Sequence, residues 1–229
     1  MSRYHHRLLK SCRIRPGERV RLARLDPVGK PLTRYILPGD APLKVRAEGL
    51  LEHSRMELAH QQDRLYASDS HAVLVLLQGM DAAGKDGTIK HVLSGVNPQG
   101  CEVHAFTEPT KEELSHTFLW RAWQRMPARG RIGIFNRSYY EEVLVTRVHP
   151  DLLSAEGVPE GRRRAALWRE RFEDINMMER HLTRNGTLIL KLFLNVSKDE
   201  QRRRLLDRLE RRDKLWKFSL ADVRERQYW

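Results

Sequence analysis

The chain has 229 residues, 40% of them apolar and 31% charged, so it is long enough for one domain with a full hydrophobic core. Lys and Arg number 42 against 30 Asp and Glu, which gives a formal net charge of +12 and a pI of about 10.1. This balance favours a polyanionic partner, such as nucleic acid, an anionic membrane or a small polyphosphate, without choosing among them. A basic but unspecific surface is the plainer alternative.

Composition also argues against two classes of protein. The two cysteines, Cys12 and Cys101, form no CxxC pair, so we expect neither a disulfide framework nor a zinc site. No apolar run approaches the roughly 18 residues that span a bilayer, and the basic N-terminus lacks an apolar signal core. We therefore expect a cytoplasmic protein without a membrane partner.

Residues 1–40 are rich in Arg, Pro and Gly and are predicted to form a basic arm, while residues 41–229 are predicted to form one domain. Asp40 is expected to cap a first helix that starts near Pro42, where an apolar stripe of helical spacing begins. The run "AVLVLLQ" at 72–78 predicts a strand buried on both faces, because continuous apolar runs are typical of parallel sheets.

Helices and strands continue to alternate along the rest of the chain. This order predicts an α/β fold, a P-loop kinase-like parallel sheet flanked by helices on both faces. Ligands bind at the carboxyl ends of such strands, so the polar residues that follow them are expected to share one crevice. The further predicted strands are 101–106, 131–135 and 187–195, and the further helices are 84–94, 110–127 (with Thr110 and Glu113 in capping-box register), 138–150, 162–184 and an arginine-dense lid helix at about 197–218.

The segment from Gly79 to Lys85 fits the pattern GxxxxGK between a predicted strand and a predicted helix, which is typical of a phosphate-binding loop. Its glycines allow a tight turn with inward N–H groups, and the helix N-terminus adds partial positive charge. Lys85 is then placed to reach a transferring phosphoryl group. A chance glycine turn before a helix is the weaker alternative.

Two carboxylates stand in this loop where an ordinary one has none. The position that usually holds a magnesium-binding Ser or Thr is Asp86, and the strand at 131–135 is followed by Asn136 rather than by an acid. We expect Asp81 to hold the metal, because Mg²⁺ takes one or two carboxylates together with substrate oxygens. For Asp86 the sequence leaves a helix cap, an orienting role toward Lys85 and a catalytic role open.

Four segments resemble the family-2 polyphosphate kinases: "GMDAAGKDG", "SGVNPQGCEVHAF", "GRIGIFNRSYYEEVLVTRVHP" and "WKFSLADVRERQYW". The match runs in order over roughly residues 40–229. The resemblance implies a P-loop kinase fold with a helical lid, and a reversible phosphoryl transfer from inorganic polyphosphate to an adenine or guanine nucleotide, dependent on Mg²⁺ or Mn²⁺. The form "FNRS-x-Y-E", which ends at Glu141, resembles the class III subgroup that phosphorylates both AMP and ADP.

The resemblance also implies roles for single residues. Catalysis is expected to involve Asp81, Lys85, Arg137 and Glu141, with Asp81 holding the metal. The nucleotide is expected to contact Gly79, Asn97, Asn136 and Glu141. The polyphosphate is expected to contact Ala82, Ala83, Gly84, Lys85, Asp86, Lys90, Arg137, Arg204, Arg208 and Lys214.

The lid helix carries the densest basic run, in which Arg204, Arg208 and Arg211 are predicted to share one face. Guanidinium groups bind phosphate through paired hydrogen bonds, so this face is expected to line a channel for the phosphate chain. Leu205, Leu206 and Leu209 are predicted to pack on the other side. A solvated basic helix is the alternative.

Two other functions stay open at this stage. One is an ATP-dependent nucleoside-monophosphate or small-metabolite kinase of the same fold. The other is a basic nucleic-acid-binding module, which the low aromatic content of 7% argues against, so no nucleic-acid partner is expected. Family members often form dimers or tetramers, so the resemblance implies a homo-oligomer. Relatives usually continue beyond the "YW" motif, so either the chain is truncated at its C-terminal end or the remainder was left out.

Overall fold

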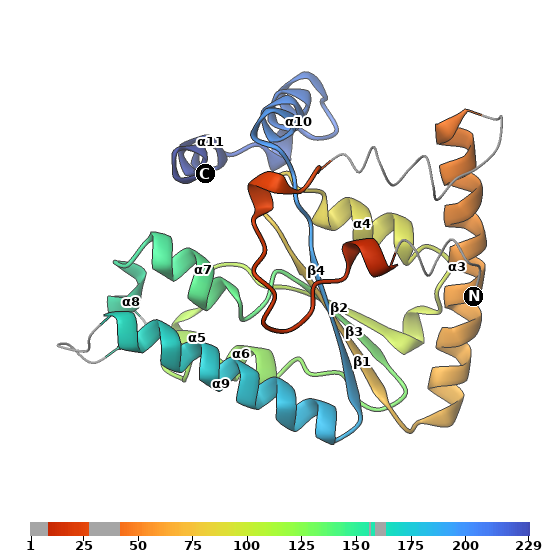
Figure 1. The fold of residues 1–229 in the computed structure, drawn as a ribbon, viewed down its shortest axis with the longest axis horizontal. Coiled ribbons are helices and arrows are strands. Elements are labelled where there is room, and N and C mark those ends of the chain that lie inside the picture. The colour runs from red at the N-terminus through yellow and green to blue at the C-terminus, as the bar shows by residue number, and fades with distance from the viewer. Residues whose placement is uncertain (1–8, 28–41, 156, 159–163) are drawn as a thin grey trace.

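The computed structural model describes residues 9–27, 42–155, 157–158 and 164–229. Within them, four parallel strands form one sheet in the order β2-β3-β1-β4 (Figure 1). All four strands were predicted from the sequence, and the α/β class is confirmed. Their bounds are β1 Ala72–Gln78, β2 Cys101–Ala105, β3 Ile132–Asn136 and β4 Thr187–Phe193.

Helices cover both faces of the sheet (Figure 1). Side chains of β1 alternate between two hydrophobic clusters, which explains why its sequence is apolar throughout. Leu74 and Leu76 belong to a cluster with Ile175, while Leu77 belongs to one that packs against Leu65 and Ile89. The first face carries α6 (Trp120–Trp123), α7 (Glu141–Val148) and α9 (Arg164–Arg184), and the second carries α3 (Leu43–Ser68) and α4 (Lys85–Val92).

The helix predicted at 110–127 is wrong, because the segment forms two short helices. The predicted capping box is present, with Glu113 N donating to Thr110 Oγ1 at 3.2 Å. However, α5 (Lys111–Leu114) ends where Ser115 Oγ donates to the carbonyl of Glu112. The chain then turns before α6, which brings Ala122 into the core. Packing against the sheet therefore outweighs local helix propensity here.

The lid differs from its prediction in length. Helix α10 (Lys198–Glu210) is capped by Ser197 but stops at Arg211, whose backbone is extended. Arg211 therefore leaves the face that Arg204 and Arg208 share, and Leu206 and Leu209 stay exposed while Leu205 is buried. After α10 follow η3 (Leu215–Lys217), α11 (Leu220–Glu225) and η4 (Arg226–Tyr228), near the end of the sheet where α4 begins (Figure 1).

Smaller differences concern the chain before and between these elements. Pro42 is the N-cap of α3, and Asp40, the predicted cap, lies outside the described residues, as does the predicted start of α9. The described part of the arm, residues 9–27, is exposed and contains η1 (Leu22–Arg24). Helix α8 (Leu152–Ala155) was not predicted. No helix in the described parts of the chain has the length and apolar character to cross a bilayer.

Candidate functional site

The loop of residues 79–84 joins β1 to α4 and fits closely against the end of β4. A Cβ on Gly79 would lie 2.9 Å from the carbonyl oxygen of Leu194, so this position has no room for a side chain. Gly84, the N-cap of α4, has a φ of 106°, a conformation that glycine adopts without strain. The two motif glycines are thus required by the backbone, as the sequence pattern predicted.

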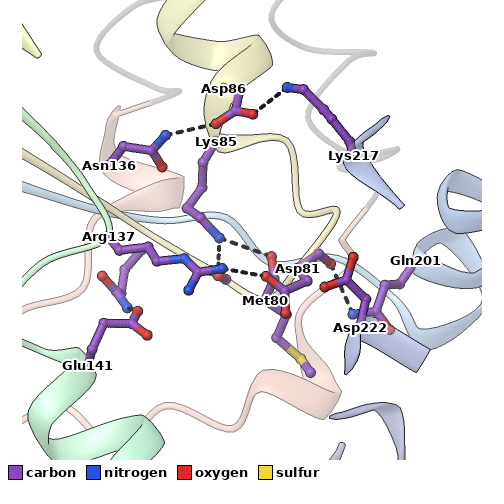
Figure 2. Close-up of polar contacts among 12 residues, drawn as sticks. Met80, Asp81, Lys85, Asp86, Asn136, Arg137, Glu141, Gln201, Lys217 and Asp222 are labelled. Carbon is purple, nitrogen blue, oxygen red and sulfur yellow. Dashed lines mark hydrogen bonds and ion pairs between the residues drawn. The ribbon is translucent and has the colours of Figure 1, made fainter. Parts of the chain in front are cut away.

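Lys85 is folded onto this loop (Figure 2). Its Nζ donates to the carbonyls of Gly79 at 2.6 Å and Met80 at 3.2 Å, and the residue is only 8% exposed. Burial and the nearby Arg137 guanidinium lower the pKa of Lys85, against the opposing effect of three carboxylates. The ammonium group therefore lies at the mouth of the loop without a carboxylate hydrogen-bonded to it.

Arg137 follows the end of β3 and crosses to the loop. Its backbone N–H donates to the carbonyl of Leu77 at 3.0 Å, which holds the residue at a φ of 63°. Such left-handed non-glycine residues are uncommon and concentrate at functional sites. The guanidinium donates to Asp81 Oδ1 at 2.7 Å (Figure 2). The predicted metal ligand and the predicted phosphate ligand are therefore in direct contact.

Glu141, the first residue of α7, is held in place by Gln78, the last residue of β1. Gln78 Nε2 donates to its carboxylate, and Ser138 Oγ donates to Gln78 Oε1 at 3.1 Å. This network positions Glu141 beside Lys85 and Arg137 (Figure 2). The sequence analysis did not single out Gln78, although a polar residue that ends an apolar strand was a usable signal.

The carboxylate of Asp86 is hydrogen-bonded to Asn136 and Lys217 rather than to the loop or to Lys85. Asn136 Nδ2 donates to its Oδ1 at 2.8 Å, and Lys217 Nζ donates to its Oδ2 at 2.6 Å. Both hydrogen bonds lower the pKa of Asp86, and the one from Lys217 has the larger effect. The residue that was expected among the polyphosphate ligands is thus bonded to protein groups on β3 and in the lid.

The lid reaches over the loop through α10. Arg204 Nη1 donates to the carbonyls of Ala82 at 3.0 Å and Ala83 at 2.9 Å, and Gln201 Nε2 donates to that of Asp81 at 3.0 Å. Two other predicted phosphate ligands are paired within the lid itself. Arg208 contacts Asp222 at 2.9 Å, and Lys214 contacts Asp207 at 2.8 Å.

Asp222 was missed by the sequence analysis, although it lies in the quoted segment "WKFSLADVRERQYW". Its side chain is 17% exposed and lies beside Asp81 (Figure 2). Burial, and then the Asp81 carboxylate, raise the pKa of Asp222. Its position depends on the turn after α10, and no local sequence pattern predicted that turn.

Three predicted residues are not brought to this site. Asn97 caps a short turn before the start of β2, at the opposite end of the strands from the loop, so the nucleotide contact expected for it stays a prediction. Lys90 is exposed in the last turn of α4. Arg211, which ends α10, pairs with its neighbour Asp213 at 2.8 Å.

A cavity adjoins the carboxyl end of β2. It has a volume of about 350 Å³ and is lined by residues that include Phe106, Thr107 and Arg121. Phe106 N donates to the carbonyl of Asn136 at 3.0 Å, which places the cavity next to the polar site. A second cavity of about 620 Å³ between α5, α6 and α9 shares Glu113 and Arg121 with it.

The acidic residues of the site fit a sparsely coordinated magnesium ion. Within the described ranges, no three His, Cys, Asp or Glu side chains gather into a protein-only metal cage. Mg²⁺ does not require one, since it is commonly bound by one or two carboxylates, with water and substrate phosphates as the remaining ligands. Asp81, with Asp222 beside it, is such a donor set.

The family model described as polyphosphate kinase 2 (PPK2) matches residues 44–229. The chain belongs to the polyphosphate kinase 2 family. The crystal structure of polyphosphate kinase 2 from Arthrobacter aurescens TC1 superposes with a TM-score of 0.82 at 39% identity, over 96% of this chain and 72% of that one.

Two relatives in this family carry functional names. The chain is 56% identical over 181 residues to the ADP-polyphosphate phosphotransferase of Rhodopseudomonas palustris, covering 79% of this chain and 63% of that protein. It is 42% identical over 221 residues to the AMP/ADP-polyphosphate phosphotransferase of Meiothermus ruber, covering 96% of this chain and 76% of that protein. The chain thus spans less than two thirds of the Rhodopseudomonas relative.

Proposed function

We propose that this chain transfers a phosphoryl group between inorganic polyphosphate and AMP or ADP, with Mg²⁺ or Mn²⁺ as the metal. The observation that supports it best is the convergence of Lys85, Arg137 and Asp81 at the carboxyl ends of β1 and β3. This is the charge pattern that phosphoryl transfer requires, because catalysis rests mainly on positioning and on neutralising the moving group. The names of the two relatives support polyphosphate as donor and the adenine nucleotides as acceptors.

The reaction is an in-line displacement. A terminal phosphate oxygen of the nucleotide attacks the end phosphorus of polyphosphate, and the bond to the neighbouring bridging oxygen breaks. The products are the extended nucleotide and a polyphosphate that is one unit shorter. No covalent enzyme intermediate is needed. When bound, Mg²⁺ held by Asp81, with Asp222 beside it, neutralises charge on the phosphate oxygens.

Two protein cations must change partners for this chemistry. Lys85 leaves the carbonyls of Gly79 and Met80, and Arg137 leaves Asp81, when phosphate oxygens enter the loop. Arg204 stands over the loop and extends the basic track toward Arg208 and Lys214. Their present partners are carbonyls and carboxylates, which a polyanion replaces at little electrostatic cost.

The acceptor nucleotide is placed on the side of Asn136 and Glu141. Asn136 ends β3, and its carbonyl accepts from Phe106 N in the lining of the cavity beyond β2, while Glu141 begins α7 and is fixed by Gln78. The polyphosphate would lie beside Arg204 of the lid, and the acceptor phosphate would reach Lys85 from the side of Glu141. This arrangement suits two substrates that enter from different directions and meet at Lys85.

The direct test is to incubate the purified chain with polyphosphate, Mg²⁺ and AMP or ADP, and to separate the nucleotides by chromatography. We expect ADP and ATP to form. A parallel reaction with ATP as donor and AMP as acceptor, without polyphosphate, distinguishes an ordinary nucleotide kinase. Lys85→Met serves as the inactive control. Transfer from ATP to AMP without any transfer from polyphosphate would contradict the proposal. Salt-sensitive binding to nucleic acid without any transfer would also contradict it.

We also propose that two or four copies assemble. The family resemblance supports this part of the proposal. Size-exclusion chromatography with light scattering checks it, and a mass of one chain at micromolar concentration would contradict it.

A further inference from the structure

The lid tip, defined here as residues 214–218, meets the phosphate loop in a different way from α10. Helix α10 begins directly after β4, and Gln201 and Arg204 fasten it to three loop carbonyls. The lid tip lies beyond the end of α10 and is joined to it by Arg208, which donates to the carbonyl of Lys217 at 3.2 Å. Lys214 Nζ also donates to Asp207 Oδ2 of α10 at 2.8 Å, and neither of these contacts reaches the phosphate loop.

In the described part of the chain, one ion pair links the lid tip to α4. Among the polar contacts of the described residues, the one that joins the lid tip to α4 or to the strand ends is Lys217 Nζ to Asp86 Oδ2, at 2.6 Å. The two residues are 131 positions apart in the chain. Figure 2 shows Lys217 reaching across to the start of α4.

The same carboxylate has a second partner on the core side. Its Oδ1 accepts from Asn136 Nδ2 at 2.8 Å, and Asn136 is the last residue of β3, directly before Arg137. Asp86 therefore bridges the lid tip and the strand end that carries Arg137. It does so at the position where ordinary phosphate loops carry a metal-binding hydroxyl.

We propose that Asp86 is a positioning residue, a latch that holds the lid tip over the phosphate loop through Lys217 and ties its closed position to Asn136. The latch itself is inferred from the structure alone, whereas its effect on catalysis rests on the proposed function. Asp86 does not need to touch the phosphate chain in this role. Its negative charge is matched by the lid cation instead.

The exposure of the pair makes the latch weak and reversible. The side chains are 61% exposed at Asp86 and 33% exposed at Lys217, so water and salt compete for them. A latch of this strength opens without a large barrier, which a site for a polymeric substrate needs. Closure then places Lys217 beside the donor while Asn136 keeps its orientation.

Hydrogen exchange of the ligand-free chain tests the latch independently of activity. Asp86→Asn and Lys217→Gln are each expected to speed exchange in the peptide that covers 211–219 by about two- to fivefold, the effect of losing an exposed ion pair. The double variant should exchange no faster than either single variant, because both remove the same contact. Asp213→Asn is the matched control, since its partner Arg211 lies in the same segment and the pair does not reach the loop.

Kinetics test the catalytic consequence. With polyphosphate and ADP, Asp86→Asn and Lys217→Gln should raise KM for polyphosphate by about three- to tenfold and leave kcat within about twofold, the signature of lost positioning rather than lost chemistry. The difference from the wild type should shrink in about 0.5 M salt, where exposed charges are screened.

Each contrary outcome overturns a distinct claim. If the two exchange effects multiply, or if Asp86→Asn alters exchange in α4 but not in 211–219, there is no latch and Asp86 only stabilises its helix. If kcat falls by orders of magnitude at unchanged KM, Asp86 acts in the chemistry instead. If exchange behaves as expected but no variant, including the wild type, uses polyphosphate, the latch stands and the proposed function fails.

Discussion

Arg137 and Asp81 form an ion pair of 2.7 Å between the end of β3 and the loop that follows β1. Arg137, the predicted phosphate ligand, and Asp81, the predicted metal ligand, thus neutralise each other's charge. An acidic residue inside a phosphate-binding loop is explained by this pairing. Under the proposed function, substrate and metal would together replace this internal ion pair with two external ones, so each would favour the binding of the other.

Asp81→Asn tests this coupling. The amide cannot hold the metal as a carboxylate does, so we expect polyphosphate turnover with Mg²⁺ to fall by about 100-fold or more. Binding of polyphosphate without Mg²⁺ should not weaken, because Arg137 loses its internal competitor. Calorimetry and turnover assays measure the two quantities. Asp63→Asn, at an exposed position of α3, controls for the loss of one charge, and near-normal turnover in Asp81→Asn contradicts the assignment.

Lys85→Met separates catalysis from folding. Methionine fills a similar volume but carries no charge, so transfer should fall by about 100- to 1,000-fold, as for a lost donor to the transition state. The melting temperature should change little, because methionine removes a buried ammonium group but also removes its hydrogen bonds to the carbonyls of Gly79 and Met80. Lys90→Met, an exposed change in the same helix, should leave both quantities unchanged. A folded and fully active Lys85→Met protein would remove Lys85 from the mechanism.

The pKa of Lys85 provides a pH test on the ligand-free chain. Burial and Arg137 lower it below the ordinary lysine value of 10.5, so the ammonium loses its proton at a lower pH than an ordinary lysine does. In the unfolded chain this lysine keeps its proton to a higher pH. Deprotonation of Lys85 therefore stabilises the folded state as the pH rises through the lowered pKa. NMR of lysine labelled at its side chain, assigned with Lys85→Arg, measures the titration. A midpoint at or above 10.5 contradicts the direction.

The sequence predicted the sheet and the centre of the site because both depend on local patterns. Continuous apolar runs identify strands buried on two faces, and the glycines of the loop are fixed by backbone geometry at Gly79 and Gly84. Placing Asn136 and Arg137 next to the loop then required only that parallel strands end at one edge.

The remaining site residues depend on contacts between distant parts of the chain. Lys217 and Asp222 reach the site because α10 stops at Glu210 and the chain turns back, whereas the basic composition predicted a longer helix. Asn97 shows the converse, since it belongs to a conspicuous motif segment but lies at the other end of the strands from the loop. Sequence spacing identifies which side chains share one face of a helix or strand. It does not identify where the turns between elements place that face.

Gly79 and Gly87 form a matched pair for the loop geometry. A methyl group at position 79 meets the Leu194 carbonyl at 2.9 Å, and the opposing atom is backbone, so the loop or β4 must shift. We expect Gly79→Ala to lower the free energy of unfolding by about 1–3 kcal/mol, the usual cost of overpacking. Gly87 lies within α4, and a methyl group there meets nothing within 4 Å. Gly87→Ala should therefore raise the free energy of unfolding by about 0.5–1 kcal/mol, because alanine is the better helix former. Urea denaturation measures both, and equal effects at the two positions would show that the loop does not depend on its contact with β4.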